Sequence, residues 1–249
     1  MNNIINFMGI RLMNYTMSEA IDSIVDKANR RSSTAVAFIN ADCVNKFNNL
    51  KYYKSLKYMD YIFADGIGIK IASMIFGNSV RDNVNGTDMF PFLLERCEQC
   101  DLSVYFYGAD EKTVNKLVMN LSEQYKELDI VGHHSGYTEK NDEAKLIKTI
   151  QEKKPQIIFV AKGAPLQEEW MSQNRDHFPD SVMIGVGGLF DFYSGRIKRA
   201  PKILRLVKLE WLYRLYCEPT RLWRRYILGN PIFLLRVICH KLFGGKNEV

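Results

Sequence analysis

A regular alternation of short apolar runs with longer amphipathic stretches constrains this chain more than any other feature. Runs such as IIFVA and MIGV are apolar at every position, which is typical of parallel strands that helices cover on both faces. The stretches between these runs carry apolar residues at helical spacing. We expect strands at residues 35–39, 61–64, 103–107, 156–161 and 182–186, a weaker strand near 129–131, and helices at 16–29, 110–126 and 141–153.

This alternation predicts an α/β fold, a Rossmann-like parallel sheet flanked by helices, over residues 1–195. Beyond that range the strand signal ends, and Arg, Lys, Leu, Trp and Tyr recur at helical spacing between Pro201, Pro219 and Pro231. We expect two or three short, basic, amphipathic helices there, which form a C-terminal appendage over residues 196–249. A chain of 249 residues is long enough for one α/β domain with such an appendage.

Positive charge is concentrated in the appendage. The whole chain has a net charge of +6, but residues 196–246 carry thirteen Lys or Arg against two acids, so the rest of the chain is net acidic. Such asymmetry indicates an anionic partner, which is lipid, nucleic acid or a phosphate-bearing substrate. In the stretch LEWLYRLYCEPTRLWRRY, arginines that can grip a diphosphate alternate with Trp and Tyr, which favour membrane interfaces. We therefore expect a segment that lies on an anionic membrane, with a solvated helix face as the alternative.

Cysteine usage and the N-terminus indicate the compartment. The five cysteines are scattered and odd in number, and residues 1–10 lack the basic and apolar segments of a signal peptide. The longest apolar candidate, residues 232–239, is interrupted by Arg236 and is too short to span a bilayer. We expect a cytoplasmic protein that is peripheral on the inner face of the cell membrane and does not cross it.

Polar residues stand where predicted strands end, which is where parallel sheets bind ligands. Asp65 follows strand 61–64 beside two glycines that let a ligand approach. A carboxylate in that place suits a general base or a hydroxyl clamp, and capping of the next helix is an equal alternative. Asn40 and Gln167 follow two other predicted strands in the same way.

Glycines mark the expected nucleotide-sugar site. Gly187 and Gly188 form a turn between a strand and a helix, and its amides could hold a diphosphate. The turn lacks the GxGxxG spacing and a Walker lysine, so a tight packing turn is the alternative. Gly108 and Asp191 are expected to belong to the same site. No DxD pair stands at a strand end and the single CxxC lacks a second pair, so we expect neither a metal nor another cofactor.

Six stretches, in this order, resemble the WecG/TagA/CpsF glycosyltransferases: FINADCV, FADGIGI, NVNGTDMF, FVAKGAPLQEEW, GVGGLFDFYSGRIKRAP and LEWLYRLYCEPTRLWRRY. The resemblance covers nearly the whole chain and implies an inverting, metal-independent hexosyltransferase at the cytoplasmic face of the membrane. Such enzymes add N-acetylmannosamine, its uronic acid or another sugar to a polyprenyl-diphosphate-linked acceptor. Their products feed wall teichoic acid, enterobacterial common antigen or capsule.

The resemblance also implies roles for single residues. Asp65 corresponds to the base that takes the proton of the acceptor hydroxyl. The other residues that the resemblance assigns to substrate binding are Asn40, Gln167, Arg214, Arg221 and Arg224. The chain departs from the family pattern at Phe38 and Ile39, where some members have threonine, and at Leu166, where lysine is often found. These departures leave the identity of the sugar open.

The expected partners are a UDP-sugar donor, a polyprenyl-diphosphate-linked saccharide acceptor and an anionic membrane surface, with no nucleic acid. Assembly of identical chains stays open.

Two alternative functions remain. An NAD-dependent enzyme on the same core would carry a glycine fingerprint after the first strand, where this chain has INADCV. A basic nucleic-acid- or membrane-binding module without catalysis would use the appendage and leave the core residues without a role.

Overall fold

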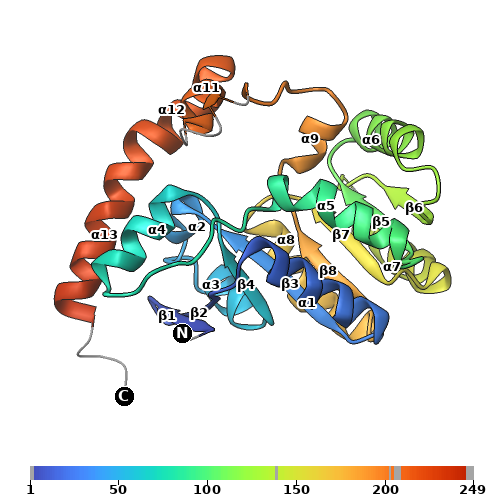
Figure 1. The fold of residues 1–249 in the computed structure, drawn as a ribbon, viewed down its shortest axis with the longest axis horizontal. Coiled ribbons are helices and arrows are strands. Elements are labelled where there is room, and N and C mark those ends of the chain that lie inside the picture. Colours follow the sequence, from blue (N-terminus) through green and yellow to red (C-terminus); the bar gives the residue numbers. More distant parts are fainter. Residues whose placement is uncertain (1–2, 138–139, 202, 205–208, 245–249) are drawn as a thin grey trace.

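A six-stranded parallel sheet forms the centre of the molecule in a computed structural model, which describes residues 3–137, 140–201, 203–204 and 209–244 (Figure 1). The strands, in their order across the sheet, are β4 (Tyr61–Ala64), β3 (Thr34–Ile39), β8 (Val182–Gly185), β7 (Ile157–Ala161), β5 (Val104–Gly108) and β6 (Ile130–His134). The α/β fold and all six expected strands are confirmed.

The last strand, β8, lies between β3 and β7 and hydrogen-bonds to both of them. The chain first adds β4 on one side of β3 and then crosses to build β5, β6 and β7 on the other side. Strand order therefore reverses at the β3–β8 junction. In open α/β sheets, ligands bind outside the carboxyl ends of the strands at such a reversal.

Side chains alternate between two cores because successive residues of a strand point to opposite faces. In β3, Ala35, Ala37 and Ile39 belong to one buried cluster, whereas Val36 and Phe38 belong to the other. The second cluster receives apolar residues of α1 (Met17–Asn29), α5 (Gly86–Gln99), α6 (Glu111–Gln124) and α9 (Leu189–Tyr193). The first receives those of α2 (Ala41–Asn45), α3 (Leu50–Lys57), α4 (Ile67–Ile75), α7 (Lys140–Lys153) and α8 (Leu166–Asn174), and a 3-10 turn, Arg175–His177, follows α8.

A short antiparallel hairpin of β1 (Ile4–Phe7) and β2 (Ile10–Met13) was not expected from the sequence. Its turn residues, Met8 and Gly9, both have positive φ, as two-residue hairpin turns require. Alternate residues of both strands are buried against the first cluster. Strands of four residues give too short a periodic signal to stand out in the sequence.

The appendage ends in a helix that is longer than expected. After α11 (Glu210–Cys217) and α12 (Pro219–Trp223), a π-helical segment, Arg224–Leu228, runs directly into α13 (Gly229–Phe243). The expectation that Pro231 interrupts the helix is wrong. Pro231 is the third residue of α13, which directly follows the π-helical segment, so the missing N–H falls where the regular α-helical hydrogen bonding is already interrupted.

The helix α13 packs along α2 and α4 at one end of the molecule (Figure 1). Phe233 and Val237 are buried there, and the Phe233 ring lies against Gly68. By length and composition alone, the stretch Arg224–Phe243 is long and apolar enough to cross a membrane. The apolar run expected at residues 232–239 is therefore part of a longer helix, and the expectation that the protein does not cross a membrane stays a prediction.

Gly108, the last residue of β5, packs closely against Ala161 of β7, and this packing predicts an effect on stability. A Cβ at this position would overlap the carbonyl oxygen of Ala161, and its φ of +140° disfavours any other residue. Gly108→Ala should lower the free energy of unfolding by about 3 kcal/mol. The matched control Gly77→Ala, with φ +79° but no atom near the added Cβ, should cost about 1 kcal/mol. Equal losses in urea titrations would contradict the packing role.

Candidate functional site

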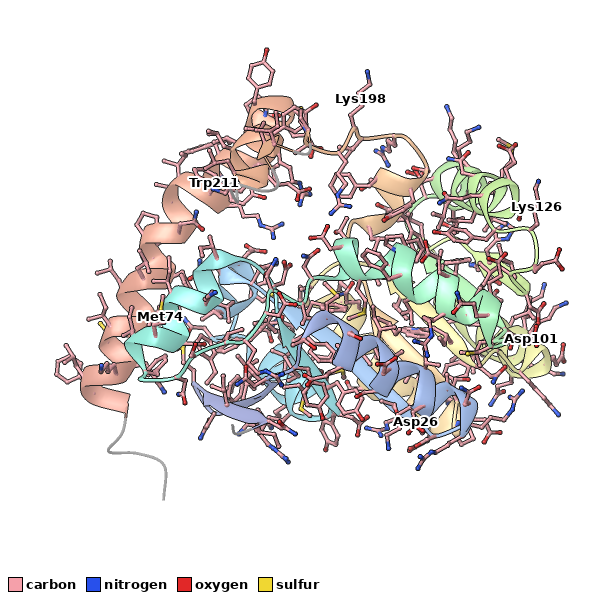
Figure 2. The ribbon with its side chains drawn as sticks, viewed as in Figure 1. Asp26, Met74, Asp101, Lys126, Lys198 and Trp211 are labelled. Carbon is pink, nitrogen blue, oxygen red and sulfur yellow. The ribbon has the colours of Figure 1, made fainter. Side chains whose placement is uncertain are left out.

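A cavity of about 1110 Å³ lies between the carboxyl ends of the strands and the appendage. The core contributes Ala109, Lys162, Gly163, Gly187 and Gly188, which all follow the ends of strands. The appendage contributes Tyr213, Arg214, Arg224, Arg225 and Gly229. The described residues between α9 and α11 lie above the sheet (Figure 1), and Figure 2 labels Lys198 on this crossing segment and Trp211 beside the top of α13. The sheet edge and the appendage thus enclose one space.

Asp65 follows β4 at this edge and is half-buried. Its backbone N–H donates to the Ile39 carbonyl at 2.8 Å, which extends the pairing of β3 with β4. Burial raises the pKa of the Asp65 carboxyl, while a hydrogen bond from Asn40 and the positive charges of Arg225 and Arg214 act in the opposite direction. Asp65 is not itself a lining residue of the cavity, but two lining arginines are close enough to influence its charge.

Asn40 connects Asp65 to the next helix. Its side-chain oxygen caps α2 by accepting the N–H of Cys43 at 3.2 Å. Since the oxygen is used by this cap, the Nδ2 group is directed to Asp65, where it donates to Oδ2 at 3.3 Å. The structure thus brings together Asn40 and Asp65 from neighbouring strands, as the strand-end rule predicts. Their parts in substrate binding and catalysis stay predictions.

Gln167 lies in the first turn of α8 and is buried. Its Oε1 accepts the N–H of Gly163 at 3.1 Å and the N–H of Gly187 at 2.8 Å. Its Nε2 donates to Glu168 at 2.9 Å. The side chain therefore holds two loops of the cavity wall at a fixed separation. A contact between Gln167 and substrate stays a prediction.

Glu168 is an acid that the sequence did not single out. It is fully buried, and its Oε2 has no hydrogen-bond partner among the described residues. Burial raises the pKa of this carboxyl to about 7. The hydrogen bond from Gln167 and the charge of Lys46 oppose the rise only in part. A buried acid with one unpaired oxygen is more stable protonated than charged.

The four residues expected at the nucleotide-sugar site have different surroundings. Gly187, Gly188 and Asp191 all line the cavity. The Gly187 N–H, however, already donates to Gln167, so this amide is occupied in the protein. Gly108 is not a lining residue, although its neighbour Ala109 is, and its close packing on Ala161 accounts for the glycine.

The two predicted appendage arginines whose side chains the structure describes, Arg214 and Arg224, both line the cavity. Arg214 stacks over the Phe192 ring at 5.1 Å, and Arg224 over the Trp223 ring at 5.4 Å. The side chain of Arg221 lies outside the described part of the structure. Stacked guanidinium groups keep their N–H donors free at the edge, which suits them to anionic oxygens.

Several residues that line the cavity are not among the expected site residues, although Tyr213 and Arg225 belong to the expected membrane segment. These residues are Asp42, Asp110, Lys162, Arg196, Tyr213 and Arg225. Asp42, Asp110 and Lys162 each lie within three residues of the end of a strand, so the rule that located Asp65 applied to them as well. Among the described residues, no three His, Cys, Asp or Glu side chains lie close enough to hold a metal ion. A metal-independent reaction stays a prediction.

Most of the chain resembles known proteins in sequence. The profile of the family described as "Glycosyl transferase WecG/TagA/CpsF family" matches residues 5–247. A Bacillus spizizenii protein named N-acetylglucosaminyldiphosphoundecaprenol N-acetyl-beta-D-mannosaminyltransferase is 34% identical over 198 residues, which are 80% of this chain and 76% of that protein. A Staphylococcus aureus protein of the same name is 29% identical over 236 residues, covering 94% of this chain and 91% of that protein.

The buried acid Glu168 predicts a pH-dependent stability. Because its folded-state pKa is raised from 4.5 to about 7, the folded protein loses stability as pH rises through this window. Glu168→Gln cannot ionise, so its stability relative to the parent should rise by up to about 3 kcal/mol between about pH 4 and about pH 8. Urea titrations across this range would check it. Parallel pH profiles for the two proteins would show that the pKa of Glu168 is the same in the folded and the unfolded protein.

Proposed function

Since this chain belongs to the WecG/TagA/CpsF family of glycosyltransferases, we propose that it transfers N-acetylmannosamine or a related hexose from a UDP-sugar to a polyprenyl-diphosphate-linked N-acetylglucosamine. The acceptor and the sugar follow the printed name that two of its relatives share. The Asn40–Asp65 pair beside an arginine-lined cavity carries the proposal. The product is the type of lipid-linked disaccharide from which wall teichoic acid or another cell-surface polysaccharide is built.

In this mechanism Asp65 accepts the proton of the acceptor hydroxyl as that oxygen attacks the anomeric carbon of the donor. A new bond forms between the acceptor oxygen and the anomeric carbon, and the bond from that carbon to the diphosphate oxygen breaks. UDP leaves from the opposite face with the bonding electrons, so the configuration inverts. The burial that raises the pKa of Asp65 makes it a stronger base once ionised. The hydrogen bond from Asn40 holds the carboxylate in place for this step.

We assign the appendage arginines to the diphosphate of the lipid-linked acceptor. Arg214 and Arg224 line the cavity from the appendage side, and Arg221 lies between them in the sequence. Guanidinium groups bind diphosphate oxygens through pairs of parallel hydrogen bonds. The charge that develops on the leaving UDP must also be neutralised, and no step of the proposed reaction uses a metal.

The outer side of α13 supports a membrane-surface location. Leu235, Leu242 and Phe243 are 62%, 67% and 71% exposed, whereas Phe233 and Val237 on the inner side are buried. An amphipathic helix with basic neighbours adheres to anionic lipid by apolar burial and charge attraction. We propose that the protein is peripheral on the inner face of the cell membrane, where the lipid-linked acceptor is found.

A non-catalytic nucleic-acid- or membrane-binding module is not supported. The family match covers the core as well as the basic appendage, so both parts belong to a glycosyltransferase. The same match argues against an NAD-dependent enzyme on this core.

Asp65→Asn should lower kcat by at least about 10²-fold, because the amide keeps the shape but cannot accept the proton. Turnover is measured as UDP release with a short-chain lipid-diphosphate N-acetylglucosamine and a panel of UDP-sugars. Asp101→Asn is a matched control. It changes an exposed aspartate at the opposite edge of the sheet, at a positive φ that asparagine accepts (Figure 2). Normal turnover of a folded Asp65→Asn protein would exclude Asp65 as the base.

The double variant Leu235→Glu with Leu242→Glu should weaken binding to anionic vesicles by about tenfold or more. Each change removes an exposed apolar side chain from α13 and adds a charge that anionic lipid repels. Vesicle co-sedimentation measures the effect. Turnover with a water-soluble acceptor should stay near that of the parent. If the double variant sediments with vesicles as the parent does, α13 does not contact the membrane.

A further inference from the structure

Lys162 is a cation in the cavity wall that no step of the proposed reaction uses. It directly follows β7, is half-buried and lines the cavity. Its Nζ donates to the Tyr107 hydroxyl at 2.8 Å and to the Gly136 carbonyl at 3.1 Å. It also lies 4.9 Å from the centroid of the Tyr107 ring. Two neutral acceptors hold the ammonium group in place, and its third N–H is not used by these bonds.

Three carboxylates of the cavity wall are already paired with cations. Asp42 accepts from Lys46 at 2.7 Å, and Asp110 accepts from Arg196 at 2.6 Å. Asp191 also lies 3.4 Å from Arg196. Within the described parts of the chain, no carboxylate forms an ion pair with Lys162. A partly buried ammonium group with only neutral partners is more stable once an anion joins it.

The strand register places this cation beside the glycine turn. Val160 pairs with Gly185 across β7 and β8. The two loops that follow contain Lys162 and Gly187, both of which line the cavity, and Gln167 joins these loops by accepting the N–H groups of Gly163 and Gly187. Neighbouring strands are about 4.8 Å apart. The amide of Gly187 is occupied by Gln167 and cannot serve an incoming phosphate without breaking that bond. Beside the glycine turn, the charge of Lys162 and not the Gly187 amide is therefore what attracts an anion.

We propose that Lys162 binds the diphosphate of the nucleotide-sugar and stabilises the negative charge that UDP carries as it leaves. The assignment rests on the proposed function and deepens it, because it states that the core side of the cavity binds the donor diphosphate. The arginines on the appendage side then bind the acceptor diphosphate. The attraction between the Lys162 ammonium group and the diphosphate is strong there because the neutral partners of Lys162 do not compensate its charge.

Calorimetric titration of the full-length protein with UDP tests this assignment. Lys162→Met should weaken UDP binding by about tenfold or more, the effect expected for a lost charge-assisted hydrogen bond. Lys116→Met is the matched control, since Lys116 is an exposed lysine on α6 outside the cavity lining. This control should bind UDP as the parent does. Farnesyl diphosphate, a soluble lipid diphosphate, should bind Lys162→Met and the parent equally well.

A second variant, Lys162→Gln, separates charge from loop anchoring and also serves if the methionine variant fails to fold. Glutamine can still donate to Tyr107 or Gly136, so the proposal expects it to lose UDP affinity as methionine does. Parent-like UDP affinity in either folded variant overturns the assignment. A loss confined to farnesyl diphosphate moves Lys162 to the acceptor and overturns it as well. A parent protein that binds no UDP overturns the UDP-sugar donor of the proposed function, and the assignment with it.

Discussion

The buried side-chain amide of Gln167 is the interaction on which the candidate site depends most. One oxygen accepts the N–H groups of Gly163 and Gly187, which belong to the loops after two adjacent strands. Away from water, each of these N–H groups would cost free energy if it lost its partner, so the two loops stay together. Glu168 accepts a hydrogen bond from the nitrogen of the same amide and so fixes the orientation of the Gln167 side chain. The wall of the cavity is therefore set from inside the protein before any ligand enters.

Charge pairs join the acidic core to the basic appendage. Arg196 reaches Asp110 and Asp191, Arg199 reaches Asp88, and Arg225 approaches Asp42. Most of these side chains are partly exposed, so each pair contributes little stability alone. Together they place the crossing segment over the strand ends. The asymmetry of charge along the sequence thus has two consequences: some appendage cations dock it on the core, and others, such as Arg214 and Arg224, line the cavity.

The sequence predicts the sheet and the meeting of Asn40 with Asp65, because apolar runs locate parallel strands and the carboxyl ends of such strands share one edge. It does not predict the continuous helix through Pro231, because the packing of Phe233 and Val237 on α2 and α4 outweighs the local preference of proline. The use of Gln167 also escapes prediction, since a glutamine that binds a sugar and one that holds two loops look alike in sequence. Lys162 directly follows a strand, so the strand-end rule applied to it, but only the fold shows that its hydrogen-bond partners are neutral.

The helix that runs from Arg224 to Phe243 has one end in the cavity wall and an exposed apolar side along its length. Asn45 anchors it to the core by donating to the Gly229 carbonyl at 2.7 Å, and Arg236 donates to Asn48 at 2.7 Å further along. A rigidly anchored helix of this kind would fix the height of the cavity mouth above any surface on which it rests. Encounters with a lipid-linked acceptor would then become a search in two dimensions. The depth to which the helix settles would decide how far along its acceptor the enzyme can reach.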